Sequence, residues 1–185
     1  PFERWMQCTG ERYGIVRAAQ QHTADTVPGT AMAVTTDVGM QYDIHPKKKQ
    51  PVGRRLALLA ENKVYGEKDV LCEAPALTGL TVADGALTLT FAHAGARLTL
   101  APAAPDGTPF APGFFSGVQV WQSGAALDAA ALTAWAAGDT VTLCGPAIRV
   151  GVPTRVELAQ TPWCQVNLYN SAGIPARPGC RTAND

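Results

Sequence analysis

The stretch from Thr35 to Arg55, TTDVGMQYDIHPKKKQPVGRR, contains an abrupt change of local pattern. Residues 30–36, which lead into it, are largely apolar and predict a short strand buried in a parallel sheet. A polar loop with two aspartates and a histidine follows, and residues 48–65 then predict an amphipathic helix. Because a strand, a polar loop and a helix follow one another, the sequence indicates an α/β arrangement.

The flanking residues extend this pattern. Residues 10–26 predict a further helix, which ends at Thr26-Val27-Pro28-Gly29. The apolar face of the helix at 48–65 holds three residues at helical spacing: Val52, Leu56 and Leu59. One strand is not a domain, so we expect the remaining strands to come from an upstream segment or from another chain.

After Asp69 the chain changes to alternating apolar and polar residues. Asp84-Gly85 separates two such runs and predicts a β-hairpin. Further alternating runs lie at 97–100, 117–121, 140–143 and 154–158. The alanine-rich residues 125–137 predict a helical turn unless neighbouring strands override that propensity. The predicted fold class is therefore α/β plus all-β, with an α/β piece at residues 1–69 and a β-sandwich accessory domain at residues 70–185.

Composition excludes some classes of protein. The chain of 185 residues carries 15 basic and 15 acidic residues, so its zero net charge gives no support for a nucleic-acid partner. Apolar runs fall short of the roughly 20 residues that a membrane span needs. A basic cluster comprises Lys47, Lys48, Lys49, Arg54 and Arg55. We interpret it as a solvated helix start and helix face.

Five cysteines lie far apart, without the C-x-x-C spacing of zinc or redox sites. Together with four tryptophans and 14 prolines they favour an oxidising compartment, which predicts a secreted, lysosomal or periplasmic location. Cys164 and Cys180 bracket a Gly- and Pro-rich segment that a disulfide could close, and Cys72 and Cys144 could form a second one. Cys8 would then be left over. The alternative is that all five are reduced thiols.

Several motifs resemble one known family. They are PGTAMAVTTD at 28–37, DIHP at 43–46, VGRRLA at 52–57, VYGEK at 64–68 and NLYN at 167–170. In this order they resemble the C-terminal part of the sialate O-acetylesterases, which belong to the SGNH (GDSL) hydrolases. The resemblance implies that residues 1–69 are the C-terminal piece of a flavodoxin-like catalytic domain. It also implies hydrolysis of acetyl esters on sialic acid or a related sugar, without a cofactor or metal.

The resemblance assigns the acid/base loop. His45 is expected to be the general base that takes the proton of a serine and returns it to the sugar oxygen. Many SGNH enzymes have Asp three residues before this His, where this chain has Tyr42. Asp43 is therefore our first candidate for the acid that orients His45, and Asp37 is the second. The alternatives are a catalytic dyad, with Asp43 only capping the turn, and a His45 that is an ordinary loop residue.

A nucleophile is missing from this chain. Ser116, Ser123 and Ser171 all lie in the predicted β region, and none has the sequence context of a nucleophile elbow. We therefore expect an upstream segment or chain to supply the serine. A second hypothesis is a non-catalytic carbohydrate-binding or assembly module derived from such an esterase. Three tryptophans could serve as a sugar platform, although buried positions are the commoner use: Trp121, Trp135 and Trp163.

Overall fold

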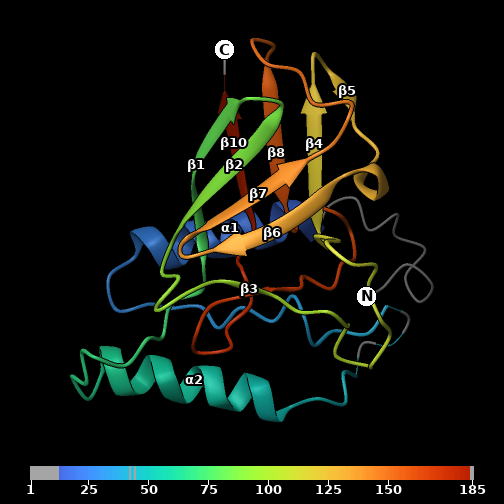
Figure 1. The fold of residues 1–185 in the computed structure, drawn as a ribbon. Coiled ribbons are helices and arrows are strands. Elements are labelled where there is room, and N and C mark those ends of the chain that lie inside the picture. Colours follow the sequence, from blue (N-terminus) through green and yellow to red (C-terminus); the bar gives the residue numbers. More distant parts are fainter. Residues whose placement is uncertain (1–12, 42, 44, 184–185) are drawn as a thin grey trace.

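The computed structural model describes residues 13–41, 43 and 45–183, which form two helices and a set of antiparallel strands (Figure 1). The helices are α1 (Tyr13–Thr26) and α2 (Gln50–Lys63). The strands are β1 (Ala76–Ala83), β2 (Ala86–Ala92), β3 (Thr99–Leu100), β4 (Val118–Gln122), β5 (Ala125–Ala126), β6 (Thr133–Ala137), β7 (Thr140–Cys144), β8 (Thr154–Leu158), β9 (Leu168–Tyr169) and β10 (Gly179–Ala183). A short 3₁₀ helix spans Ala129–Ala131.

Both predicted helices form. α1 ends at Thr26, as the sequence predicts, and α2 has a proline in its first turn, where the missing N–H costs nothing. The face of α2 differs from the prediction, because Leu59 is buried but Leu56 is 54% exposed. Arg55, predicted to be solvated, is buried instead. It is paired with a buried carboxylate, which compensates the burial of its charge.

The predicted hairpin is confirmed. β1 and β2 pair antiparallel, and Ala83 lies opposite Ala86 across the two-residue turn. Asp84 and Gly85 both have positive φ, at 51° and 72°. Aspartate and glycine tolerate this left-handed backbone, which matches the twist of the two strands.

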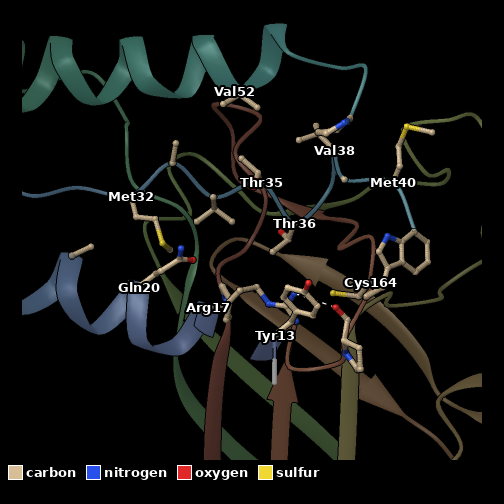
Figure 2. Close-up of a pocket in the computed structure, with 18 of the residues that line it drawn as sticks. Tyr13, Arg17, Gln20, Met32, Thr35, Thr36, Val38, Met40, Val52 and Cys164 are labelled. Carbon is tan, nitrogen blue, oxygen red and sulfur yellow. Dashed lines mark hydrogen bonds between the residues drawn. The ribbon is translucent and has the colours of Figure 1, made fainter. Parts of the chain in front are cut away.

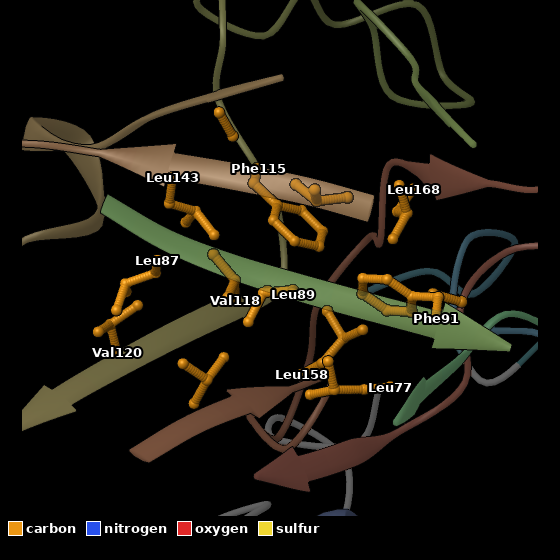
Figure 3. Close-up of a cluster of buried hydrophobic side chains, with 14 of the residues drawn as sticks. Leu77, Leu87, Leu89, Phe91, Phe115, Val118, Val120, Leu143, Leu158 and Leu168 are labelled. Carbon is orange, nitrogen blue, oxygen red and sulfur yellow. The ribbon is translucent and has the colours of Figure 1, made fainter. Parts of the chain in front are cut away.

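The strands form two four-stranded antiparallel sheets and one short pair. Their orders are β1-β2-β7-β6, β10-β8-β4-β5 and β3-β9. Side chains alternate along the strands, so one face of each sheet is buried, and both buried faces contribute to a single hydrophobic cluster (Figure 3). Leu87, Leu143 and Leu158 in this cluster are fully buried. The prediction of a β-rich region after residue 70 is thus confirmed.

One local prediction was wrong and another was confirmed in part. Residues 30–35 are extended but form no strand, because no described strand lies beside them to complete a ladder. Of the alanine-rich residues 125–137, Ala129–Ala131 form a helical turn of the 3₁₀ type, and β5 and β6 lie on either side of it. There the pairing of β6 with β7 overrides the helical propensity of alanine.

The predicted disulfides do not form. Cys72, Cys144, Cys164 and Cys180 are free thiols, and Cys8 lies outside the described residues. Cys180 pairs with Glu157 across β10 and β8, and its Sγ lies 3.4 Å from Nε of Arg155. The ladder of β10 with β8 fixes the C-terminal end of the segment that a disulfide was expected to close.

The N-terminal helices pack against the C-terminal loops. Arg177 forms an ion pair with Asp25 of α1 at 2.9 Å. Arg54 of α2 donates to the carbonyl of Ala172 at 2.7 Å. These two contacts attach α1 and α2 to the C-terminal loops of the β-rich region (Figure 1). Within the described part of the chain, no helix is both long and apolar enough to cross a membrane.

Candidate active site

The structure brings Asp43 and His45 together in the loop before α2. Oδ1 of Asp43 lies 3.2 Å from Nδ1 of His45 and accepts the backbone N–H of His45 at 2.8 Å. The side chain of His45 is 83% exposed, and that of Asp43 is 43% exposed. One carboxylate oxygen therefore fixes both the turn and the ring, so the capping and orienting roles of Asp43 coexist.

The charge of Asp43 is stabilised by this geometry. The hydrogen bond from the backbone N–H of His45 is the main cause that lowers the pKa of Asp43, and the ring of His45 adds to it. An ionised Asp43 can accept the Nδ1–H of His45. That bond leaves Nε2 as the free ring nitrogen, which is the arrangement a general base needs.

A cavity of about 780 Å³ is lined by Asp43 of this pair but not by His45, and Figure 2 shows other residues around it. Asp43 and Pro46 line it, together with residues from α1, from the extended segment at 30–36 and from residues 162–164. Figure 2 shows Arg17 and Gln20 of α1 at this cavity, with Met32, Val38 and Met40 of the following segment. The acid/base loop therefore borders a space that is large enough for a sugar or for a segment of polypeptide.

Arg17 is a cavity residue that the sequence did not single out. Its guanidinium donates to the carbonyls of Thr161 and Pro162, which ties α1 to the segment before Cys164. Burial lowers the pKa of Arg17 and raises the pKa of the Cys164 thiol. Helical periodicity alone could not have distinguished Arg17 from a solvated arginine.

Asp37, the second candidate for the acid, is in a different setting. Its carboxylate makes a two-pronged ion pair with Arg55, with both bonds at 2.7 Å, and both residues are 4% exposed. The hydroxyl of Tyr169 donates to the same carboxylate at 3.2 Å, and Arg55 also donates to the carbonyl of Val34 at 2.9 Å. Burial, followed by the charge of Asp37, raises the pKa of Tyr169. Asp37 thus binds α2 and β9 to the extended segment.

The three serines lie elsewhere. No described serine lines the Asp43 cavity. The backbone N–H of buried Ser116 donates to Asn167, Ser123 occupies a turn with φ of 49°, and the hydroxyl of Ser171 accepts the N–H of Ala96. Within the described part of the chain, no group of three or more His, Cys, Asp or Glu residues could hold a metal ion.

The tryptophans split between buried and exposed positions. Trp121 and Trp163 are partly buried, and their indole N–H groups have no hydrogen-bond partner among the described residues. Trp163 lines the Asp43 cavity. Trp135 is 48% exposed on β6, away from that cavity.

The fold is similar to that of a known enzyme. A crystal structure of a carbohydrate acetylesterase from Xanthomonas citri superposes with a TM-score of 0.72 and 28% sequence identity. The match covers 94% of this chain and 38% of that one, so this chain spans well under half of the longer protein. No protein-family model and no curated protein matches the sequence. Fold and sequence together therefore indicate kinship with a carbohydrate esterase.

Proposed function

We propose that this chain is the acid/base part of a carbohydrate O-acetylesterase, with the nucleophilic serine supplied by an upstream segment or a second chain. The proposal rests on one observation: Asp43, which is hydrogen-bonded to His45, lines a large cavity that no described serine lines. The likeness to a carbohydrate acetylesterase supports the same reaction class. The fold that goes with the proposal is the C-terminal piece of an SGNH hydrolase domain followed by a β-sandwich.

The proposed chemistry is acyl transfer. Nε2 of His45 takes the proton of the serine as its oxygen attacks the acetyl carbonyl, and the proton then goes to the departing sugar oxygen. Water next attacks the acetyl-serine and gives its proton to His45. Acetate leaves, and the serine oxygen takes that proton back. Asp43 holds the ring and stabilises the imidazolium, whereas Asp37 is the less suited candidate because Arg55 occupies its carboxylate.

The extended segment supports docking of the missing part. Among the described residues, Ala31, Met32 and Ala33 have no backbone hydrogen-bond partner, and all three line the cavity. An extended segment with free N–H and C=O groups accepts a neighbouring strand readily. A segment that pairs there would enter the cavity bordered by Asp43.

The test uses the native assembly, which is this chain with any polypeptide that accompanies it. An intact mass under reducing and non-reducing conditions should show a second polypeptide or a longer one. In that assembly His45→Ala should lower kcat for acetate release from an O-acetylated sialic acid by roughly 10³-fold. His22→Ala, on the exposed side of α1, is the matched control.

The outcomes separate the hypotheses. Asp43→Asn should lower kcat more than Asp37→Asn does once folding is controlled for, and small effects from both would indicate a dyad. Near-normal turnover by His45→Ala would exclude His45 as the base. A native protein without any serine hydrolase partner or segment would favour the non-catalytic carbohydrate-binding or assembly module.

A secreted, lysosomal or periplasmic location also belongs to this proposal. The tryptophan and proline content supports it, but the four free thiols give it no support. Fractionation of the source cells with a compartment marker is the direct test. Recovery in the cytosolic fraction would exclude the proposed location.

A further inference from the structure

A second hollow lies on the β-rich region beside β3 and β6. It has a volume of about 560 Å³ and shares no lining residue with the Asp43 cavity. Three aromatic side chains line it: Phe110, Phe114 and Trp135. We call it the Trp135 groove. Nothing in the acyl-transfer chemistry uses these residues.

Trp135 faces outward in this groove. β6 is an edge strand, and the alternation along it places Ala134 inside and Trp135 outside with 48% exposure. The rings of Phe110 and Phe114 lie beside each other, 5.8 Å apart and tilted by 32°. A flat indole at the surface of a groove offers an apolar platform whose desolvation favours binding.

The walls of the groove are held in place by a buried amide. Asn167 is 1% exposed, and its Nδ2 donates to the carbonyls of Ala101 at 3.1 Å and Phe114 at 2.9 Å, one on each wall. Its Oδ1 accepts the N–H of Ser116 at 2.9 Å. These bonds fix the spacing of the walls, so a ligand does not have to order them on binding.

Gly113 brings the aromatic loop close to β6. Its φ is 71°, and a Cβ built there would lie 2.6 Å from Cγ2 of Thr133. The N–H of Ala134 donates to the carbonyl of Gly113 at 2.7 Å. The loop with both phenylalanines is therefore attached to the strand that carries Trp135.

One unpaired cation borders the groove. Arg97 is exposed, and among the described residues that line the groove it is the single charged one. Its guanidinium has no hydrogen-bond or ion-pair partner in the described part of the chain. A guanidinium beside an aromatic platform complements a planar carboxylate held next to an apolar ring face.

We propose that the Trp135 groove is a carbohydrate-binding site for a pyranoside that carries a carboxylate. The C–H face of the sugar ring packs on the indole of Trp135, and the carboxylate accepts hydrogen bonds from Arg97. The inference rests on the proposed function only for the class of ligand, because binding here requires neither His45 nor a serine. The groove would hold an acidic sugar chain away from the reacting ester.

The experiment is an NMR titration of the ¹⁵N-labelled 185-residue chain with sialyllactose and, in parallel, with lactose. The two probes differ by the carboxylated sugar. The indole N–H signal of Trp135, assigned by its loss in Trp135→Phe, should shift on titration with sialyllactose. Sialyllactose should bind about tenfold more tightly than lactose, and the difference should shrink at high salt.

Two variants assign the contacts. Arg97→Gln should weaken sialyllactose about tenfold and leave lactose unchanged, while Trp135→Ala should weaken both. Arg149→Gln, an exposed arginine outside the groove, is the matched control and should bind like the parent chain. Far-UV circular dichroism checks that each variant is folded.

Equal binding of the two sugars would overturn the proposal, as would an unchanged affinity in Arg97→Gln or the absence of a Trp135 shift. Loss of esterase activity in His45→Ala with unchanged sugar binding would support a binding site in the Trp135 groove that is independent of His45. The failure of one proposal is therefore distinguishable from the failure of the other.

Discussion

At the residue scale, the buried Asp37–Arg55 ion pair differs from every other charged contact in the described chain, because both of its partners are removed from water. Each member is 4% exposed, and the pair connects the extended segment, α2 and, through Tyr169, β9. An isolated charge in such a place is costly, so the two residues stabilise the fold only as a pair.

Arg55→Met should therefore lower the free energy of unfolding by about 3–5 kcal/mol, because it leaves the Asp37 carboxylate buried without its partner. Arg149→Met is the control, since Arg149 is exposed and its loss should cost less than about 1 kcal/mol. Urea unfolding measures both. An Arg55→Met variant as stable as the control would show that the pair contributes nothing.

The Asp43–His45 contact gives a prediction about pH. Its hydrogen bonds lower the pKa of Asp43, so they are fully present above the ordinary aspartate value of about 3.9 and are lost as the pH falls through the lowered pKa. The backbone amide signal of His45 should follow that transition in an NMR pH titration. The transition should vanish in Asp43→Asn. A midpoint at the ordinary value would contradict the contact.

At the scale of elements, two helical glycines test how α1 is held. In α1, a Cβ at Gly14 would lie 2.5 Å from the backbone oxygen of Gln160, so the helix packs directly on the chain before Trp163. In α2, a Cβ at Gly53 would meet nothing within 4 Å. The same substitution therefore has opposite expected effects in the two helices.

Gly14→Ala should destabilise the protein by about 1–2 kcal/mol, because overpacking outweighs the gain in helix propensity. Gly53→Ala should stabilise it by about 0.5–1 kcal/mol through propensity alone. Thermal unfolding of the two variants side by side measures the difference. Stabilisation by Gly14→Ala would mean that α1 does not pack against Gln160.

At the scale of the whole molecule, the chain holds Asp43 and His45, the proposed acid and base, and no described serine lines the cavity that Asp43 borders. The chain by itself should therefore take no label from a serine-directed fluorophosphonate, and it should release no acetate from an acetylated sugar. Mass spectrometry of the treated chain is the measurement, with an active serine hydrolase in the same tube as the positive control. A label on Ser116, Ser123 or Ser171 would contradict the proposed division of the active site.

Local sequence determined where several helices, turns and strands of this protein form. The end of α1 at Thr26 and the Asp84-Gly85 hairpin follow from turn chemistry between neighbouring residues, and the strands after residue 70 follow from period-two alternation. The loop with Asp43 and His45 was singled out by the family resemblance, and the contact between the two residues is local because they are two apart in the chain.

Tertiary structure decided the rest, because it brings together residues that no local pattern connects. The sequence predicts Arg55 to be a solvated helix residue. In the structure it is buried in an ion pair with Asp37, which lies 18 residues away, and Asp37 in turn accepts a hydrogen bond from Tyr169, 132 residues further along the chain. Residues 30–35 have the composition of a strand but form none, since a strand needs a neighbour. Residues 133–137 became a strand because β7 supplied that neighbour. The walls of the Trp135 groove are likewise tied together by Asn167, which lies 66 residues from Ala101 and 53 from Phe114 in the chain.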